Sequence, residues 1–264
     1  MIDKEDIKIL RNLAQQVAEI AELPIMEERR RMWKQHNQLK RVRPMILVFP
    51  EGSWRELLPQ SMLHCRGETA RQIEYQLRQR IYQYHHIHDN SVVEKKWVVN
   101  KAIYTTGWGL EPKHKASSQD RGSWGFDPVI NDYNDLKKLK FPRVHYDEKE
   151  TLKRLEEAEE LFGDILDIQL KGINHISFHL MNIYCELRGL EQVMWDMHDN
   201  PGMLHEAMHF LEEGHRQLVQ QYYEFNLFSL NNDETYHSSG GVGYTDELPK
   251  PDYNPEKIRP CDMW

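Results

Sequence analysis

The chain contains one motif of a kind that binds a catalytic metal, a pair of histidines four residues apart. His205-Glu206-Ala207-Met208-His209 matches the H-E-x-x-H pattern, in which two imidazoles on one helix face hold zinc and the glutamate activates a bound water. His215 follows at the distance of a third zinc ligand. By residue type alone, this segment could be the zinc site of a metalloprotease.

The helical phase of the same segment favours a different interpretation. At about 100° per residue, the apolar residues of the segment, Leu204 and Leu211 among them, form one stripe, and His215 falls within it. His205 and His209 fall outside the stripe, on the polar side of the helix. We therefore expect a solvated face here, and a zinc metalloprotease is the less favoured function.

A second set of residues that could take part in catalysis or binding lies beside apolar runs that predict strands. In a parallel α/β arrangement reactive groups gather at strand ends, and carboxylates there can transfer protons. The candidate catalytic residues are Glu51, Glu94 and Asp233. The candidate substrate contacts are Trp54, Lys96, Trp97, Gln169, Asn174, His175, Asn232 and Tyr244. Structural roles stay open for several of them, since tryptophans pack well in cores, a strand has one wet face, and an Asn-Asn-Asp run is typical of turns.

Strands and helices alternate along the chain in a way that would position these residues. Apolar runs predict strands at 45–49, 92–99, 165–170 and 225–230. Helical spacing marks 4–22, 26–39, 68–86 and 147–162, then one helix up to about Asp199 and another beginning at Asn200-Pro201. Glycines and tryptophans between 104 and 130 predict a long ordered loop or a β-hairpin. Strand, helical layer and strand make a β-α-β crossover, which implies parallel strands.

Composition limits the classes of function. The 264 residues carry a net charge of −8, which disfavours a nucleic-acid partner because such binding rests on cationic surface. We interpret the basic run Arg29-Arg30-Arg31 as a solvated helix face. The sequence contains no run of 18 apolar residues, so no membrane span is predicted. Its three cysteines are widely spaced, so no disulfide framework is predicted either. A cytoplasmic protein is therefore expected.

Three segments carry a family resemblance. Leu170-Lys171-Gly172, Glu186-Leu187-Arg188-Gly189 and the run from Met197 to His205 resemble the central part of the uroporphyrinogen decarboxylase superfamily. Arg43-Pro44-Met45-Ile46 and Gly243-Tyr244-Thr245-Asp246-Glu247-Leu248-Pro249 resemble a decarboxylase-like branch of it. The superfamily includes the decarboxylases and the methyltransferases that act with corrinoid proteins.

The resemblance implies an α/β fold, a TIM-type (β/α)8 barrel of the uroporphyrinogen decarboxylase-like kind. Residues 1–42 would form an N-terminal helical extension, and residues 43–264 the N-terminal part of the barrel. The barrel is expected to be incomplete in this chain, because about four or five parallel strands are predicted and eight are needed. A homo-oligomer or a second subunit would then cover the open sheet edge.

The resemblance also ranks the functions. Decarboxylases of the family hold porphyrinogen carboxylates with an arginine-rich loop, where this chain has only Arg55, and use an aspartate where it reads Glu94-Lys95-Lys96-Trp97. Methyl transfer between a small-molecule donor or acceptor and a corrinoid protein is the favoured function. Zinc is a possible cofactor, with its ligands expected outside this chain, and the corrinoid would be carried by the partner protein. The alternative is a non-catalytic scaffold or partner subunit of such a system.

Overall fold

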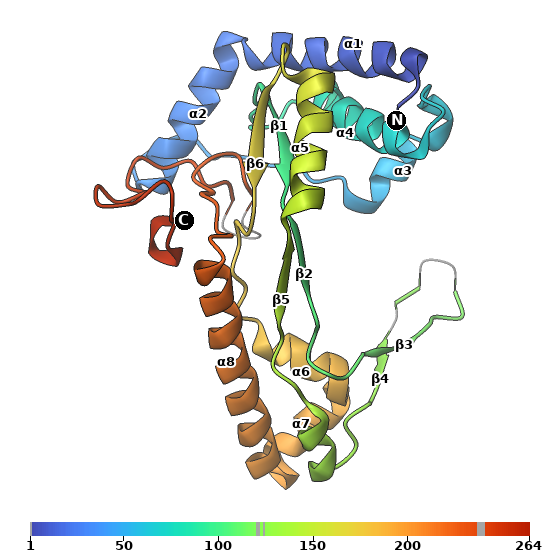
Figure 1. Cartoon of the computed structure of the whole chain (residues 1–264), viewed down its shortest axis with the longest axis vertical. Coiled ribbons are helices and arrows are strands. Elements are labelled where there is room, and N and C mark those ends of the chain that lie inside the picture. Colours follow the sequence, from blue (N-terminus) through green and yellow to red (C-terminus); the bar gives the residue numbers. More distant parts are fainter. Residues whose placement is uncertain (1, 120–121, 124, 237–240) are drawn as a thin grey trace. The chain divides into compact units, whose positions relative to one another are not determined.

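The computed structural model describes residues 2–119, 122–123, 125–236 and 241–264. It is a mixed α/β structure in which the described strands form three two-stranded sheets and no closed barrel. The chain divides into two compact units, each built from separate segments of sequence (Figure 1). Unit 1 comprises Met1–Lys101, Glu148–Asn174 and Ser229–Trp264, and unit 2 comprises Ala102–Asp147 and His175–Phe228.

Unit 1 places a parallel pair of strands against helices. Strand β1 (Lys96–Asn100) pairs with β6 (Asp167–Lys171), with Lys96 opposite Asp167 and Asn100 opposite Lys171. The helices of unit 1 are α1 (Lys4–Ala21), α2 (Pro24–Asn37), α3 (Trp54–Leu57), α4 (Glu68–Tyr82) and α5 (Glu148–Phe162), with a π-helical turn at Gln83–Ile87 and 3-10 turns at Glu51–Ser53, Gln60–Met62 and Pro260–Asp262. The four predicted helices of this unit are thereby confirmed to within a few residues.

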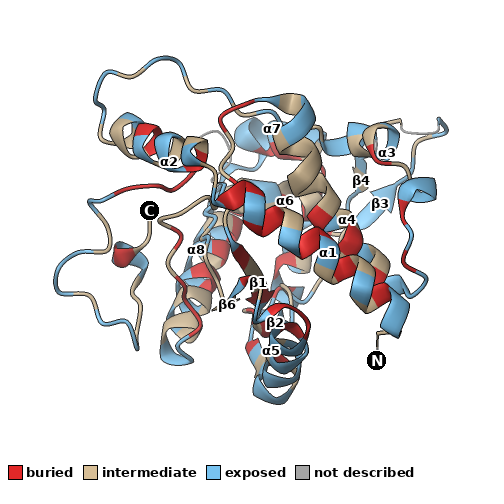
Figure 2. Cartoon of the chain, turned by 90° about the horizontal axis from the view of Figure 1, so that it is seen from above, coloured by how far each residue is buried: buried red, intermediate tan, exposed pale blue. Residues whose placement is uncertain are grey.

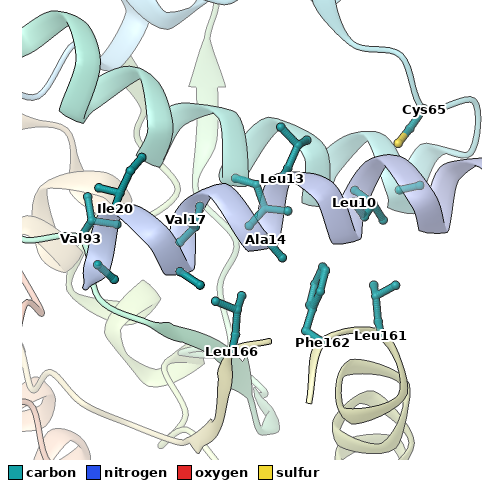
Figure 3. Close-up of a cluster of buried hydrophobic side chains, with 14 of the residues drawn as sticks. Leu10, Leu13, Ala14, Val17, Ile20, Cys65, Val93, Leu161, Phe162 and Leu166 are labelled. Carbon is teal, nitrogen blue, oxygen red and sulfur yellow. The ribbon is translucent and has the colours of Figure 1, made fainter. Parts of the chain in front are cut away.

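Helix α1 supplies the centre of the core of unit 1. Leu10, Ala14 and Val17 are fully buried, and buried positions recur along α1 in Figure 2. Figure 3 shows these side chains gathered with Phe162 of α5 and Leu166, which precedes β6. Burying each large aliphatic side chain of this kind stabilises a fold by about 1.5–3 kcal/mol. The predicted apolar stripe of the first helix therefore holds the helical layer together.

The β1–β6 pair has two chemically different faces, because successive strand residues point to opposite sides. Trp97 and its register partner Ile168 pack against the helical core, with the Trp97 ring 5.3 Å from that of Phe162. Lys96 and Lys171 occupy the alternate positions and are both buried, at 8% and 7% exposure. The pair thus presents an apolar face to the helices and buried ammonium groups on its other face.

The predicted strand at 45–49 is wrong. These residues form no strand ladder, and the side chains of Asp89 and Asn90 take the place of a neighbouring strand. Asn90 Oδ1 accepts from the Ile46 N–H at 2.9 Å, and Asp89 Oδ2 accepts from the Val48 N–H at 2.8 Å. The apolar run indicated a buried strand, but Ile46 is 59% exposed.

The predicted strand at 225–230 is also wrong. This segment follows the last helix irregularly, and Asn226 has a left-handed φ of 53°. Ser229 nevertheless lies beside the end of β6, since its N–H donates to Ile173 O at 2.9 Å and its hydroxyl accepts from the Gly172 N–H at 2.7 Å. The parallel partner of the predicted 165–170 strand is β1 instead, because an apolar run does not specify which strand will be its neighbour.

Unit 2 combines two antiparallel strand pairs with three long helices. Strand β2 (Ala102–Thr105) pairs with β5 (Val144–Asp147), and β3 (Lys113–Lys115) pairs with β4 (Gly125–Asp127). The second pair confirms the hairpin alternative for 104–130. The helical elements are η4 (Tyr133–Lys138), α6 (Leu180–Arg188), α7 (Leu190–Asp199) and α8 (Pro201–Glu224). The single helix predicted up to Asp199 is interrupted at Gly189, whose φ of 82° suits glycine alone.

A buried ion pair joins α6 to α7. Arg188 donates through Nε and Nη2 to the two carboxylate oxygens of Asp196, at 2.7 and 2.8 Å. The remaining Nη1 donates to the carbonyls of Ile130 and Asn131 at 3.0 and 2.8 Å. Both side chains are almost completely buried, at 6% and 0% exposure. The buried guanidinium charge is therefore neutralised only while Asp196 stays ionised.

Replacing Asp196 by asparagine should destabilise the protein strongly. The Asp196→Asn change leaves the Arg188 charge buried without its counter-ion, which costs about 3–5 kcal/mol. Denaturant unfolding would measure this loss in the free energy of unfolding. The matched control is Asp199→Asn at the end of α7, where the pair with His198 is exposed and the loss should stay below about 1 kcal/mol. Equal effects of the two changes would contradict the assignment.

Candidate functional site

A network of charged side chains lies on the polar side of the β1–β6 pair in unit 1. We call it the charged cluster, and its members are Arg30, Glu94, Lys96, Lys171, Asp233, Glu234 and Tyr244. It draws on α2, on both strands of the parallel pair and on the two segments 229–236 and 241–264. Four of the predicted site residues, Glu94, Lys96, Asp233 and Tyr244, are thereby brought together.

Lys96 is the centre of one half of the cluster. Its ammonium lies 2.7 Å from Asp233 Oδ2 and 2.6 Å from Glu234 Oε2. The contact with Glu234 is an ion pair, and Glu234 Oε2 has no hydrogen-bond partner among the described residues. Lys171 donates to the same oxygen of Asp233 that Lys96 contacts. The Asp233 carboxylate therefore contacts the buried ammonium groups of both Lys96 and Lys171, and Glu234 contacts that of Lys96 as well.

Glu94 is the centre of the other half. Arg30 donates to both of its oxygens, from Nε at 2.9 Å and from Nη2 at 3.0 Å. The Tyr244 hydroxyl donates to Glu94 Oε1 at 2.5 Å. Arg80 of α4 donates to the backbone carbonyls of Glu94 and Lys96. This guanidinium therefore secures the chain just before and at the start of β1.

Local hydrogen bonds hold Asp233 in place. Its Oδ1 accepts from the Thr235 N–H at 3.0 Å and from the Thr235 hydroxyl at 2.5 Å, as in an Asx turn. Asn231, which is 1% exposed, donates to the carbonyls of Asn174 and Trp264, both at 2.8 Å. The turn expected in this segment is thus present, and it positions a carboxylate at the ends of two lysine side chains.

The two neighbouring carboxyl groups have opposite proton affinities. Burial by itself would raise the pKa of Asp233, but the charge of Lys96 and the hydrogen bonds from both lysines outweigh it and hold that pKa well below its usual range. For Glu234, burial and the adjacent Asp233 charge together raise the pKa, and Lys96 offsets this only in part. Two carboxyl groups with divergent pKa values can divide the roles of a fixed charge and a proton donor.

The Asn232 side chain is buried next to this pair. Its Oδ1 and Nδ2 atoms are both inaccessible and have no hydrogen-bond partner among the described residues. Buried amides left without partners are rare in folded proteins. The predicted substrate contact at this position therefore has a donor and an acceptor that a change in the segment could turn toward a ligand.

The other predicted site residues lie elsewhere. Glu51 is exposed in a 3-10 turn with a left-handed φ of 46°, and Trp54 packs edge-on against Tyr82 at 5.6 Å. Trp97 packs against the helical core, which confirms the packing role that was the alternative to substrate contact. The remaining three residues take separate positions. The Gln169 side chain donates to the Asp167 carboxylate, and the Asn174 backbone carbonyl accepts from the Asn231 side chain. His175 belongs to unit 2 and is exposed.

Sequence reasoning missed several members of the cluster. Arg30 was assigned to a solvated face, which is wrong, because it is half-buried against Glu94. Lys171 is one of the polar groups expected at the end of the central strand, and Glu234 stands in the polar run after Asn231, but no local pattern shows the partner of either residue. Their partners are 62 and more residues away along the chain, so only the fold reveals them. His237, which follows the same polar run, lies outside the described residues.

The histidine motif on α8 behaves as its helical phase predicts. His205 and His209 are exposed, whereas His215 is 8% exposed and its ring packs 4.8 Å from that of Phe178. Glu206 accepts a hydrogen bond from the Tyr133 hydroxyl. Across the described part of the chain, no three His, Cys, Asp or Glu side chains form a group suited to a metal ion.

Comparisons with known proteins find no relative of this chain. No family model, no curated protein and no solved structure matches this chain. In the part of the chain that the structure describes, no helix has both the length and the apolar composition needed to cross a membrane.

The charged cluster should lose its contribution to stability in acid. Because the folded-state pKa of Asp233 is lowered, its stabilisation is complete above the unfolded value of about 4 and disappears as the pH falls through the folded-state value. The difference in free energy of unfolding between wild type and Asp233→Asn should therefore be large at pH 7 and shrink steadily below about pH 4. Urea titrations at stepwise lower pH would measure it. A difference that stays constant with pH would contradict the assignment.

Proposed function

We propose that this chain is a uroporphyrinogen decarboxylase-like protein that transfers a methyl group between a small molecule and a corrinoid protein, with the charged cluster at its reaction site. The observation that carries the proposal is the Lys96 ammonium held between two carboxyl groups of opposite proton affinity. The family resemblance supplies the reaction class. The convergence of Glu94, Lys96, Asp233 and Tyr244, nominated from the sequence alone, supports the choice of site.

Methyl transfer from a donor needs a proton at the leaving group. When the bond between the methyl carbon and its oxygen or nitrogen breaks, the electron pair stays on the heteroatom, which is then protonated. The corrinoid of the partner protein would carry the methyl group. A carboxylic acid with a raised pKa suits proton delivery near neutral pH, and Glu234 is the group of this kind in the cluster.

The other members of the cluster would position and support this acid. Asp233 stays ionised and holds Lys96 and Lys171. Burial and the Asp233 charge raise the pKa of Glu234, and the Lys96 charge offsets part of that rise. The Asp233 and Glu234 side chains are 25% and 30% exposed, whereas Lys96 is 9% exposed behind them. A ligand would approach the exposed part of these two side chains, because Glu234 Oε2 itself is inaccessible.

Glu234→Gln should abolish most methyl transfer, because glutamine cannot donate an acidic proton. The expected loss in kcat is about 10²–10⁴-fold, as for removal of a general acid. Asp233→Asn should instead shift the pH profile of kcat/KM, because it changes the charge next to Glu234. The assay would follow methylation of the corrinoid protein by its absorbance, with each methyl donor supplied in turn.

The matched control is Glu160→Gln, an exposed glutamate on α5 outside the cluster, which should retain the wild-type rate. Wild-type rates in Glu234→Gln would remove the cluster from the mechanism. An unchanged pH profile in Asp233→Asn would remove its positioning role.

A partner subunit without catalytic activity is the second candidate function. Helix α7 exposes Leu190, Met194, Trp195 and Met197 at 57–65%, which is a large apolar face for a surface helix. Leu190, Met194 and Met197 share one side of the helix by their spacing. Such a face is typical of protein contacts, and methionines adapt readily to a partner.

If α7 is a contact surface, Met194→Ser with Trp195→Ser should weaken association. Light scattering after size exclusion would show a lower mass, or a lost complex with the corrinoid protein, relative to wild type. Glu160→Gln again serves as the control. Unchanged masses and complexes in the double variant would exclude this surface, and methyl transfer by the wild type would exclude a purely non-catalytic role.

A further inference from the structure

An open groove of about 960 Å³ lies within unit 2, separate from the charged cluster of unit 1. One wall is the segment from Leu139 to His145, which leads into β5, and the other is the face of α8 that carries Phe210, Gln217 and Gln221. Its volume falls at the upper end of the range of about 300–1,000 Å³ typical of small-molecule sites. The groove is therefore large enough for a ligand of nucleotide size.

The rim of the groove carries unpaired positive charge. Lys140 and Arg143 line it and are exposed, with the exposed imidazole of His145 beside them. Within the described residues, no ion pair or side-chain hydrogen bond engages any of these three side chains, and no carboxylate is among the groove's lining residues. In a chain of net charge −8, a groove whose charged lining residues are Lys140 and Arg143 favours an anionic ligand.

The floor of the groove is aromatic. The rings of Phe141 and Phe210 are stacked, with centroids 4.5 Å apart and an interplanar angle of 28°. Phe141 is held there by a close approach to Gly214 of α8, where an added Cβ would lie 2.8 Å from Phe141 Cδ1 and 2.6 Å from Trp108 Cζ3. Both phenylalanines are half-buried, so their rings leave surface on which another flat ring can stack.

The backbone that carries the cations is fixed before any ligand arrives. The Gln221 amide pairs with the edge of β5 in place of a strand, accepting from the Val144 N–H at 2.9 Å and donating to the Pro142 carbonyl at 3.0 Å. Arg143 donates through its N–H to the Thr106 hydroxyl at 3.0 Å, and its carbonyl accepts from the Thr106 N–H at 3.1 Å. The groove is thus preorganised, which reduces the entropy lost on binding.

We propose that this groove binds an organic phosphate that carries a flat ring, of the nucleoside diphosphate class. The Arg143 guanidinium matches the geometry of phosphate oxygens, Lys140 adds a point charge, and the flat ring stacks over Phe141 and Phe210. A small molecule is favoured over an acidic protein because the cations surround a groove with an aromatic floor rather than a flat patch.

Calorimetric titration of the full chain with ADP, adenosine and inorganic phosphate at low salt tests the proposal. ADP should bind saturably and more tightly than either fragment, because only ADP uses both the charged rim and the aromatic floor. Arg143→Gln and Lys140→Gln should each weaken ADP binding about tenfold or more, as expected for a lost charge-assisted contact. Phe210→Leu should weaken ADP binding while leaving phosphate binding unchanged.

The control is Lys115→Gln, an exposed cation on β3 of the same unit, which should bind ADP as the wild type does. Circular dichroism and thermal melting of each variant establish that it is folded. The proposal is overturned if ADP does not bind, or if folded Arg143→Gln and Lys140→Gln bind it as tightly as wild type. Equal affinity for phosphate and ADP would overturn the assignment of the aromatic floor.

Discussion

The contact of Lys96 with Asp233 is the interaction on which the polar side of unit 1 depends. A buried ammonium group must have a counter-ion, because the loss of hydration is otherwise far larger than any packing gain. The β1–β6 pair can carry lysines on one face only while the segment 229–236 brings its carboxyl groups alongside. The same contact also places Glu234 beside Asp233, and this proximity makes their proton affinities diverge.

The two units use charge in opposite ways. In unit 2, Arg188 is buried and donates four hydrogen bonds to Asp196 and two carbonyls, which is typical of a structural pair. The cations at the groove are exposed and unpaired, so their donors are available to a ligand. In the charged cluster, buried ammonium groups contact carboxyl side chains that are partly exposed, so a fixed charge lies close to the surface. Only the last two arrangements can support binding or chemistry.

Part of the candidate site could be predicted from local patterns. Glu94 and Lys96 lie in an apolar run that overlaps β1, so the strand that positions them is visible in the sequence. Asp233 was expected at the end of a strand that does not form, and the turn with Thr235 positions it instead. Arg30 could not be predicted, because a basic residue on a charged helix has many nearby acidic residues, whereas its partner Glu94 is 64 positions away. The prediction of Glu51 as a catalytic residue is not supported for a related reason, because the strand expected at 45–49 to position it does not form.

The sequence by itself determined most of the helices and their buried stripes, because helical periodicity repeats over several turns and can be recognised without knowing any partner. It also determined that His205 and His209 face away from the core while His215 enters it. Only the tertiary structure decided which strands pair, since backbone hydrogen bonds carry no residue identity. It also decided that Asp89 and Asn90 would replace a strand beside residues 45–49. The tertiary structure also decided which charged side chains pair, because pairing depends on distances in space that the order of residues along the chain does not give.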